Sequence, residues 1–125
     1  MATLGATLGN ISPGAVEIEI RPHPGISQQH GFMHAGAVSA IADSAAGYAA
    51  LSLMPDGRGV LTTEYKINLL APAAGDHIEA IGTVLRSGRT LTVCQLEVYA
   101  VQSAGERKLV ANGQQTLIRV NKPTQ

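Results

Sequence analysis

The residue best placed to do chemistry in this 125-residue chain is Asp43. It is the only charged residue in an apolar segment, 34–54, that contains eight alanines and ends before Pro55. A carboxylate in such surroundings can deprotonate a water molecule or attack a carbonyl carbon. The alternative is a solvated acid on the outside of an amphipathic helix. An exposed face would normally carry Lys, Glu or Gln, and the segment has none, which favours a functional Asp43.

The segment 34–54 predicts one long helix, because alanine is the best helix former. About 21 residues at ~1.5 Å each would span roughly 31 Å. Small residues are expected to share the helical face of Asp43, namely Gly36, Ser39, Ala40, Ala46, Gly47 and Ala50. The opposite side is expected to face the core and carries Val38, Ile41, Tyr48 and Leu51. A ligand or another backbone could therefore approach Asp43 closely.

Alternating apolar and polar residues predict five strands that accompany this helix. We expect them at 14–21, 60–70, 77–86, 90–101 and 108–120. A turn at 73–76 precedes the last three strands, which are joined by short glycine-bearing connections at 87–89 and 103–106. We therefore expect the last four strands to be consecutive and antiparallel. Because a sheet must bury one face and the helix is its available partner, we expect one curved sheet wrapped around one helix. Residues 1–125 are expected to form a single α+β domain.

Composition argues against several functional classes. Nine basic and nine acidic residues give zero formal charge without a basic block, so no nucleic-acid partner is expected. The single Cys94 excludes an intrachain disulfide and fits a reducing, cytoplasmic location. The run 35–54 approaches membrane-spanning length, but it carries Asp43 and lacks basic flanks, so no membrane partner is expected. Only 14% of residues are charged, which suggests a buried subunit interface.

The pattern resembles the hotdog-fold thioesterases, specifically the phenylacetic-acid-degradation (PaaI-like) branch. Residues 28–43, QQHGFMHAGAVSAIAD, are similar to the family's loop-to-helix signature of His-Gly-Gly followed by a helical acid. Residues 63–73, TEYKINLLAPA, resemble a strand that ends in a Leu-x-Pro-Ala step, and 88–90 and 111–113 also match. The resemblance runs from 14 to 120 and implies a hotdog fold, with a central helix wrapped by a five- to six-stranded antiparallel sheet.

The resemblance implies an acyl-CoA thioesterase without a cofactor or metal. Asp43 matches the catalytic carboxylate, acting as general base or nucleophile, and His34 matches the signature histidine. A ring that only fixes the loop is the alternative for His34. Ala35 stands where the family has a glycine whose N–H polarises the thioester carbonyl. Gln28 matches a Gln or Asn that helps to hold the thioester or water, and Thr62 falls near an assisting Ser or Thr.

Four further residues are candidates for substrate binding. Gly36 follows Ala35 at the expected helix start, and Gly47 stands where one subgroup has Ser or Thr. Arg86 and Arg89 flank a turn and are candidates for the phosphates of coenzyme A, with a plain surface hairpin as the equal alternative. No pair of histidines shows metal-ligand spacing, which argues against a metal site. Cys94 is expected in the core, and Glu64 is expected to be a solvated strand charge.

The spacing between His34 and Asp43 predicts a shared site. Nine residues correspond to ~900° of rotation and ~13 Å of rise, so the two lie on opposite faces of one helix. A two-fold dimer could pair Asp43 of one chain with the loop of the other, as the family does. We therefore expect a homodimer with shared active sites, and the resemblance extends this to a dimer of dimers. A hotdog enoyl-thioester hydratase or dehydratase, and a non-catalytic acyl-CoA binding module, remain alternatives.

Overall fold

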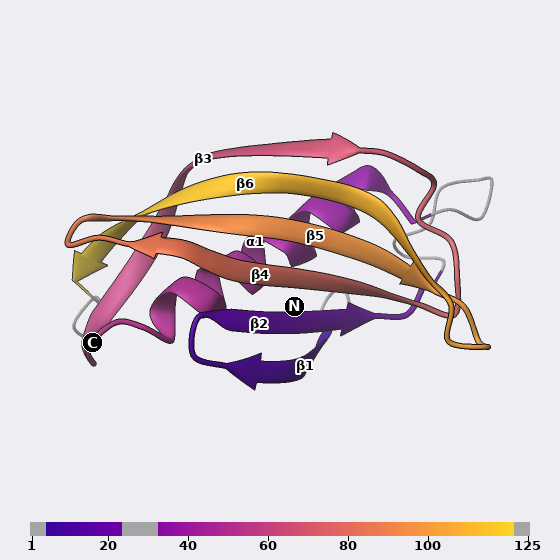
Figure 1. The fold of residues 1–125 in the computed structure, drawn as a ribbon, viewed down its shortest axis with the longest axis horizontal. Coiled ribbons are helices and arrows are strands. Elements are labelled where there is room, and N and C mark those ends of the chain that lie inside the picture. The colour runs from indigo at the N-terminus through magenta and orange to yellow at the C-terminus, as the bar shows by residue number, and fades with distance from the viewer. Residues whose placement is uncertain (1–4, 24–32, 122–125) are drawn as a thin grey trace.

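The computed structural model describes residues 5–23 and 33–121. Within these ranges a six-stranded antiparallel sheet has the order β1-β2-β4-β5-β6-β3. Its strands are β1 (Thr7–Ser12), β2 (Ala15–Ile20), β3 (Arg58–Leu69), β4 (His77–Ser87), β5 (Leu91–Val101) and β6 (Arg107–Asn121). The helix α1 (Ala35–Leu51) runs along one face of this sheet (Figure 1). The predicted arrangement of one helix against a five- to six-stranded antiparallel sheet is confirmed.

The strand β1 is absent from the sequence prediction. Its sequence, TLGNIS, contains Gly9 and Asn10, which are poor strand formers. Its side chains are almost all exposed, and its ladder with β2 shifts register between Leu8 and Ile11. An irregular, exposed edge strand of this kind has too little apolar alternation to be recognised.

The expectation of four consecutive neighbouring strands is wrong for β3. Instead of pairing with β4, β3 lies at the far edge of the sheet and pairs with β6 (Figure 1). The ladder extends from the Arg58–Asn121 pair to the Leu69–Ala111 pair. Only β4, β5 and β6 form a meander, so the predicted turn at 73–76 belongs to a crossover between β3 and β4 and not to a hairpin.

The helix α1 has 17 residues and ends three residues before the predicted boundary. Ser52 Oγ donates to the Ala49 carbonyl at 2.6 Å and accepts the Gly14 N–H at 2.7 Å. The N–H groups of Leu53 and Met54 bond carbonyls three residues back, at 3.2 and 3.0 Å. Such tightening of the last turn ends many helices. No helix of the described ranges has the length and hydropathy needed to cross a membrane.

The alanine-rich side of α1 packs against the sheet. Ala46 and Ala50, expected on an open face beside Asp43, are completely buried. Tyr48, expected in the core, is 47% exposed, whereas Val38 and Ile41 are buried as predicted. The assignment of faces is therefore partly wrong, because a curved sheet surrounds more of the helix than a single stripe. The sheet contributes large apolar side chains to this core, including Ile18, Ile20, Ile78, Leu96 and Val98.

Candidate active site

Asp43 is half-buried on α1 and is the centre of a small hydrogen-bond network. Its Oδ1 accepts a hydrogen bond from Thr62 Oγ1 of β3 at 2.7 Å and another from Gln115 Nε2 of β6 at 2.6 Å. The Gln115 amide also donates to Thr62 Oγ1 at 2.9 Å. Three side chains from three elements therefore meet at one carboxylate oxygen.

A bulge in β3 sets the position of Thr62. Thr62 pairs with Leu117 of β6, whereas Glu64 pairs with Thr116, so Thr63 is the extra residue. A bulge changes which side chains face each side of a sheet. This explains why the simple alternation predicted for 60–70 does not hold along the whole strand.

The position of Gln115 follows from the register of β5 and β6. Gln115 pairs with Cys94, whose thiol donates to the Ala46 carbonyl of α1 at 3.7 Å. Both side chains therefore face the helix. The sequence patterns do not predict Gln115 as a site residue, although one signal exists. Ala111 and Leu117, which stand at alternating positions of β6 together with Gln115, are buried. An amide at an inward position of an otherwise apolar strand face is a recognisable exception.

Two cavities border Asp43 and Thr62. The first, of about 230 Å³, is also lined by Gly47 and Tyr48. A methyl group on Gly47 would meet nothing within 4 Å, so this glycine leaves open space beside the carboxylate. The second, of about 450 Å³, continues along β3 to Tyr65. A larger hollow of about 650 Å³ overlies β3, β5 and β6 without Asp43 and is lined mainly by polar residues.

The start of α1 is built around His34. Its Nδ1 accepts the N–H of Gly36 at 2.9 Å, and its carbonyl accepts the N–H groups of Ala37 and Val38 at 2.9 and 3.1 Å. This side chain caps the helix, which supports the structural interpretation of His34. The N–H of Ala35 has no acceptor among the residues that the structure describes. Such orphan N–H groups at a helix start can bind an anionic oxygen.

The structure brings together only some of the predicted site residues. Asp43, Thr62 and Gly47 share one cavity, whereas His34, Ala35 and Gly36 border neither of the two cavities at Asp43. Ala35 and Asp43 are eight residues apart on α1, about 12 Å of helical rise. Gln28 lies outside the described residues.

Arg86 and Arg89 are exposed near the β4–β5 turn. They border neither of the cavities at Asp43, and they form no ion pair with the described residues. Glu64 is exposed, as expected for a solvated strand charge, and it also borders the second cavity.

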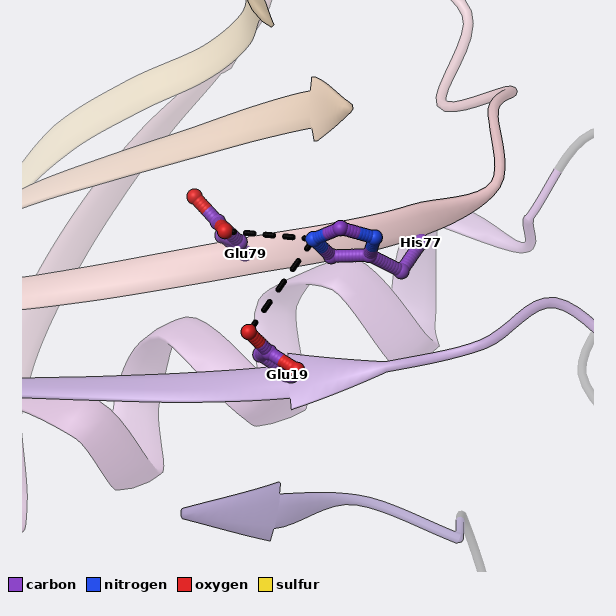
Figure 2. Close-up of side chains that lie close together, drawn as sticks. All are labelled: Glu19, His77 and Glu79. Carbon is purple, nitrogen blue, oxygen red and sulfur yellow. Dashed lines mark hydrogen bonds and ion pairs between the residues drawn. The ribbon is translucent and has the colours of Figure 1, made fainter. Parts of the chain in front are cut away.

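A second polar cluster lies on the outer face of β2 and β4. Figure 2 shows Glu19, His77 and Glu79, whose potential metal-ligand atoms lie within 4.8 Å of one another. His77 Nε2 is 3.1 Å from Glu79 Oε2 and 4.0 Å from Glu19 Oε1. Sequence spacing could not reveal this group, because Glu19 lies on another strand, directly opposite Glu79.

Positively charged side chains beside this cluster form ion pairs with its acidic residues and with Asp76. Arg107 lies 3.2 Å from Glu79 Oε1, and Arg21 lies 2.8 Å from Asp76 Oδ2. The hydrogen bond with Asp76, at 3.1 Å, raises the pKa of His77 above its usual value. Hydrogen bonds from His77 and Arg21 hold the pKa of Asp76 below its usual range. We interpret the group as an ion-pair network that lets acidic side chains occupy facing positions.

Comparisons with known proteins identify the family and the fold of this chain. The chain matches the family model described as Thioesterase superfamily over residues 30–105, more than half of its length. The crystal structure of a thioesterase family protein from Silicibacter pomeroyi is 45% identical, with 97% of this chain and 88% of that chain covered and a TM-score of 0.92. The predicted hotdog fold of PaaI-like thioesterases is confirmed.

Two further proteins are similar to this chain, one in its structure and one in its sequence. The PaaI protein of the Escherichia coli phenylacetic acid degradation operon is 24% identical, with 97% of this chain and 83% of that chain covered and a TM-score of 0.82. A Saccharolobus solfataricus protein named as a candidate esterase is 32% identical over 88 residues, or 70% of this chain. The match spans 62% of the length of that relative.

Proposed function

Because the chain belongs to the thioesterase superfamily, we propose that it hydrolyses an acyl-CoA thioester to a carboxylic acid and coenzyme A. The observation that carries this proposal is the setting of Asp43. Its Oδ1 is held by two donors, and its side chain borders two cavities large enough to receive parts of an acyl thioester. Its other oxygen, Oδ2, accepts no hydrogen bond from the described residues and is available for chemistry.

Asp43 acts as general base or nucleophile. As a base it takes a proton from water while the water oxygen attacks the thioester carbon; the tetrahedral intermediate then expels the thiolate of coenzyme A, which takes up that proton. As a nucleophile it displaces the thiolate to form an anhydride, which water hydrolyses. In both routes the N–H of Ala35 would stabilise the oxyanion, aided by the positive end of the α1 dipole. Gln28 and His34 would complete the loop that holds the thioester.

The site is shared between two subunits of a homodimer. The strand β3 is an edge strand of the described sheet, and Leu61, Tyr65 and Leu69 on it are 60%, 47% and 57% exposed. Such an edge is a template for pairing with a second chain. Because the second cavity of Asp43 follows β3, pairing there would cover it with elements of the partner. The partner would supply the α1 start that Asp43 cannot reach in its own chain.

The remaining features fit this assignment. Each subunit would be one hotdog domain, two dimers would form a tetramer, and the protein would act in the cytoplasm. Arg86 and Arg89, which have no ionic partner among the described residues, would meet the phosphates of coenzyme A. No cofactor or metal takes part in this proposal.

Release of free thiol from a panel of acyl-CoAs, measured with a chromogenic thiol reagent, tests the proposal. Thiol release from saturated substrates separates a thioesterase from a hydratase and from a binding module. Asp43→Asn is isosteric but neither basic nor nucleophilic, and Asp43→Ala removes the group; both should lose at least ~10²-fold in kcat while remaining folded. Burial raises the pKa of the Cys94 thiol to about 11, so the protein itself should not react with the reagent. Near-wild-type turnover of either variant would exclude Asp43 from the mechanism and make Glu64 the next candidate for the catalytic carboxylate.

A further inference from the structure

Gln115 is a polar side chain in an apolar place. It is 1% exposed, and Thr92 is the only other buried polar residue among those that the structure describes. A buried amide is costly unless its groups are hydrogen-bonded, so packing alone would favour an apolar side chain here. The contacts of Gln115 therefore indicate why an amide occupies this position.

The two ends of the Gln115 amide have unequal surroundings. Nε2 lies 2.6 Å from Asp43 Oδ1 and 2.9 Å from Thr62 Oγ1, whereas Oε1 has no hydrogen-bond partner within residues 5–23 and 33–121. Chemistry fixes this orientation, because a flipped amide would place its oxygen against the carboxylate oxygen. The side chain thus uses its donors at the Asp43 carboxylate and leaves its acceptor unsatisfied.

The network acts on one carboxylate oxygen only. Gln115 donates to Thr62 and to Asp43, and Thr62 donates in turn to the same Asp43 Oδ1. Two donors from two different strands define the rotation of the carboxyl group, which one donor would leave adjustable. Hydrogen bonds of such a connected set also polarise and strengthen one another.

We propose that Gln115 is a positioning residue of the hydrolytic site, which with Thr62 locks Asp43 Oδ1 so that Oδ2 is presented to the reacting water or thioester carbon. This inference rests on the proposed function of Asp43 and adds a residue that acts through it. Reaction rates depend steeply on such alignment, so looser positioning should reduce turnover much more than substrate affinity.

The first test is Gln115→Met, which keeps the length of the side chain and removes its polar atoms. We expect kcat for acyl-CoA hydrolysis to fall ~10- to 100-fold, with KM changed by less than about twofold. We expect the melting temperature to stay equal or rise, because the unpaired Oε1 disappears. Thr92→Val is the matched control, since it removes a buried hydroxyl on β5 that also lacks a partner in the described part of the chain. Its kcat should equal that of the wild type.

A second variant gives an independent readout. Gln115→Glu has the same shape and places a second carboxylate against Asp43. The two groups would share one proton, so the acidic limb of the kcat profile should move to higher pH. This profile is measurable in any folded preparation, even if Gln115→Met fails to fold. A wild-type kcat in Gln115→Met, or an unmoved profile in Gln115→Glu, would overturn the assignment.

The double variant Asp43→Asn/Gln115→Met separates this inference from the proposed function. If Gln115 acts through Asp43, the second substitution should not reduce the residual activity of Asp43→Asn further. An additive loss would contradict the positioning role. Absence of thiol release by the wild type would refute the proposed function, and a fully active Asp43→Asn would refute the role of Asp43. An inactive Asp43→Asn with a fully active Gln115→Met would refute only the role of Gln115.

Discussion

Gly82 of β4 lies directly against the backbone of Ala46 in α1. A methyl group built on Gly82 would be only 2.5 Å from the Ala46 nitrogen, closer than real side chains allow. The sheet and the helix therefore meet backbone to backbone at this point. The small residues of α1 serve this close approach, with Asp43 at the border of the packed region.

The close contact predicts opposite effects for two glycine substitutions. Gly82→Ala should destabilise the protein by about 1–3 kcal/mol, because the backbone of α1 must move. The effect would be opposite to the usual one, because replacing a glycine within a strand normally increases stability. Gly47→Ala should stabilise by up to ~1 kcal/mol, since alanine favours helix and nothing lies within 4 Å. Urea unfolding of both variants checks this pair, and an unaffected Gly82→Ala would mean that helix and sheet are further apart.

A proline at position 35 tests the oxyanion donor. Ala35→Pro removes the backbone N–H at the first helical residue, where helices tolerate proline. His34 has φ −61° and ψ 138°, the conformation preferred before a proline. We expect kcat for thioester hydrolysis to fall ~10²- to 10³-fold with little change in melting temperature. Ala35→Gly keeps the N–H and is the matched control. Wild-type turnover of Ala35→Pro would exclude this N–H from the mechanism.

The sequence could predict the helix and five strands, and it could single out Asp43 as a candidate, because these depend on local patterns. Alanine content and alternation reveal the elements, and a lone acid in an apolar helix is a local exception. The position of β3 beside β6 and the network of Gln115 depend on contacts between distant segments. The 4.0 Å contact between Glu19 and His77 is of the same kind, since two strands far apart in sequence create it. No local pattern could reveal the bulge that turns Thr62 toward Asp43.

The ion-pair network of His77 predicts a pH-dependent stability. Its pKa is raised, chiefly by the hydrogen bond with Asp76, so the protonated ring stabilises the folded chain. This contribution is fully present below about pH 6.5, the usual pKa of histidine. It is lost as the pH rises through the higher pKa of the folded state. We expect a loss of no more than ~1 kcal/mol for a partly exposed pair of this kind.

Urea unfolding of the wild type and His77→Gln between pH 5.5 and 8.5, a range of about three units around the histidine pKa, checks this expectation. The wild type should lose stability across the range, and the variant should show a flatter profile. Asp76→Asn should flatten the profile as well, because it removes the main cause of the raised pKa. Parallel profiles for the wild type and His77→Gln would show that folding does not change the pKa of the His77 ring.

The shared site predicts complementation between two inactive variants. In a mixed dimer of Asp43→Ala and Ala35→Pro subunits, one site would carry both lesions and the other neither. After refolding an equal mixture, about half of the dimers should be mixed, and activity should return to about a quarter of the wild type. Mixed dimers purified through two different affinity tags should have about half of the wild-type activity. Each variant refolded alone is the control and should stay inactive. Purified mixed dimers without activity would place Asp43 and the Ala35 N–H of each site in the same chain.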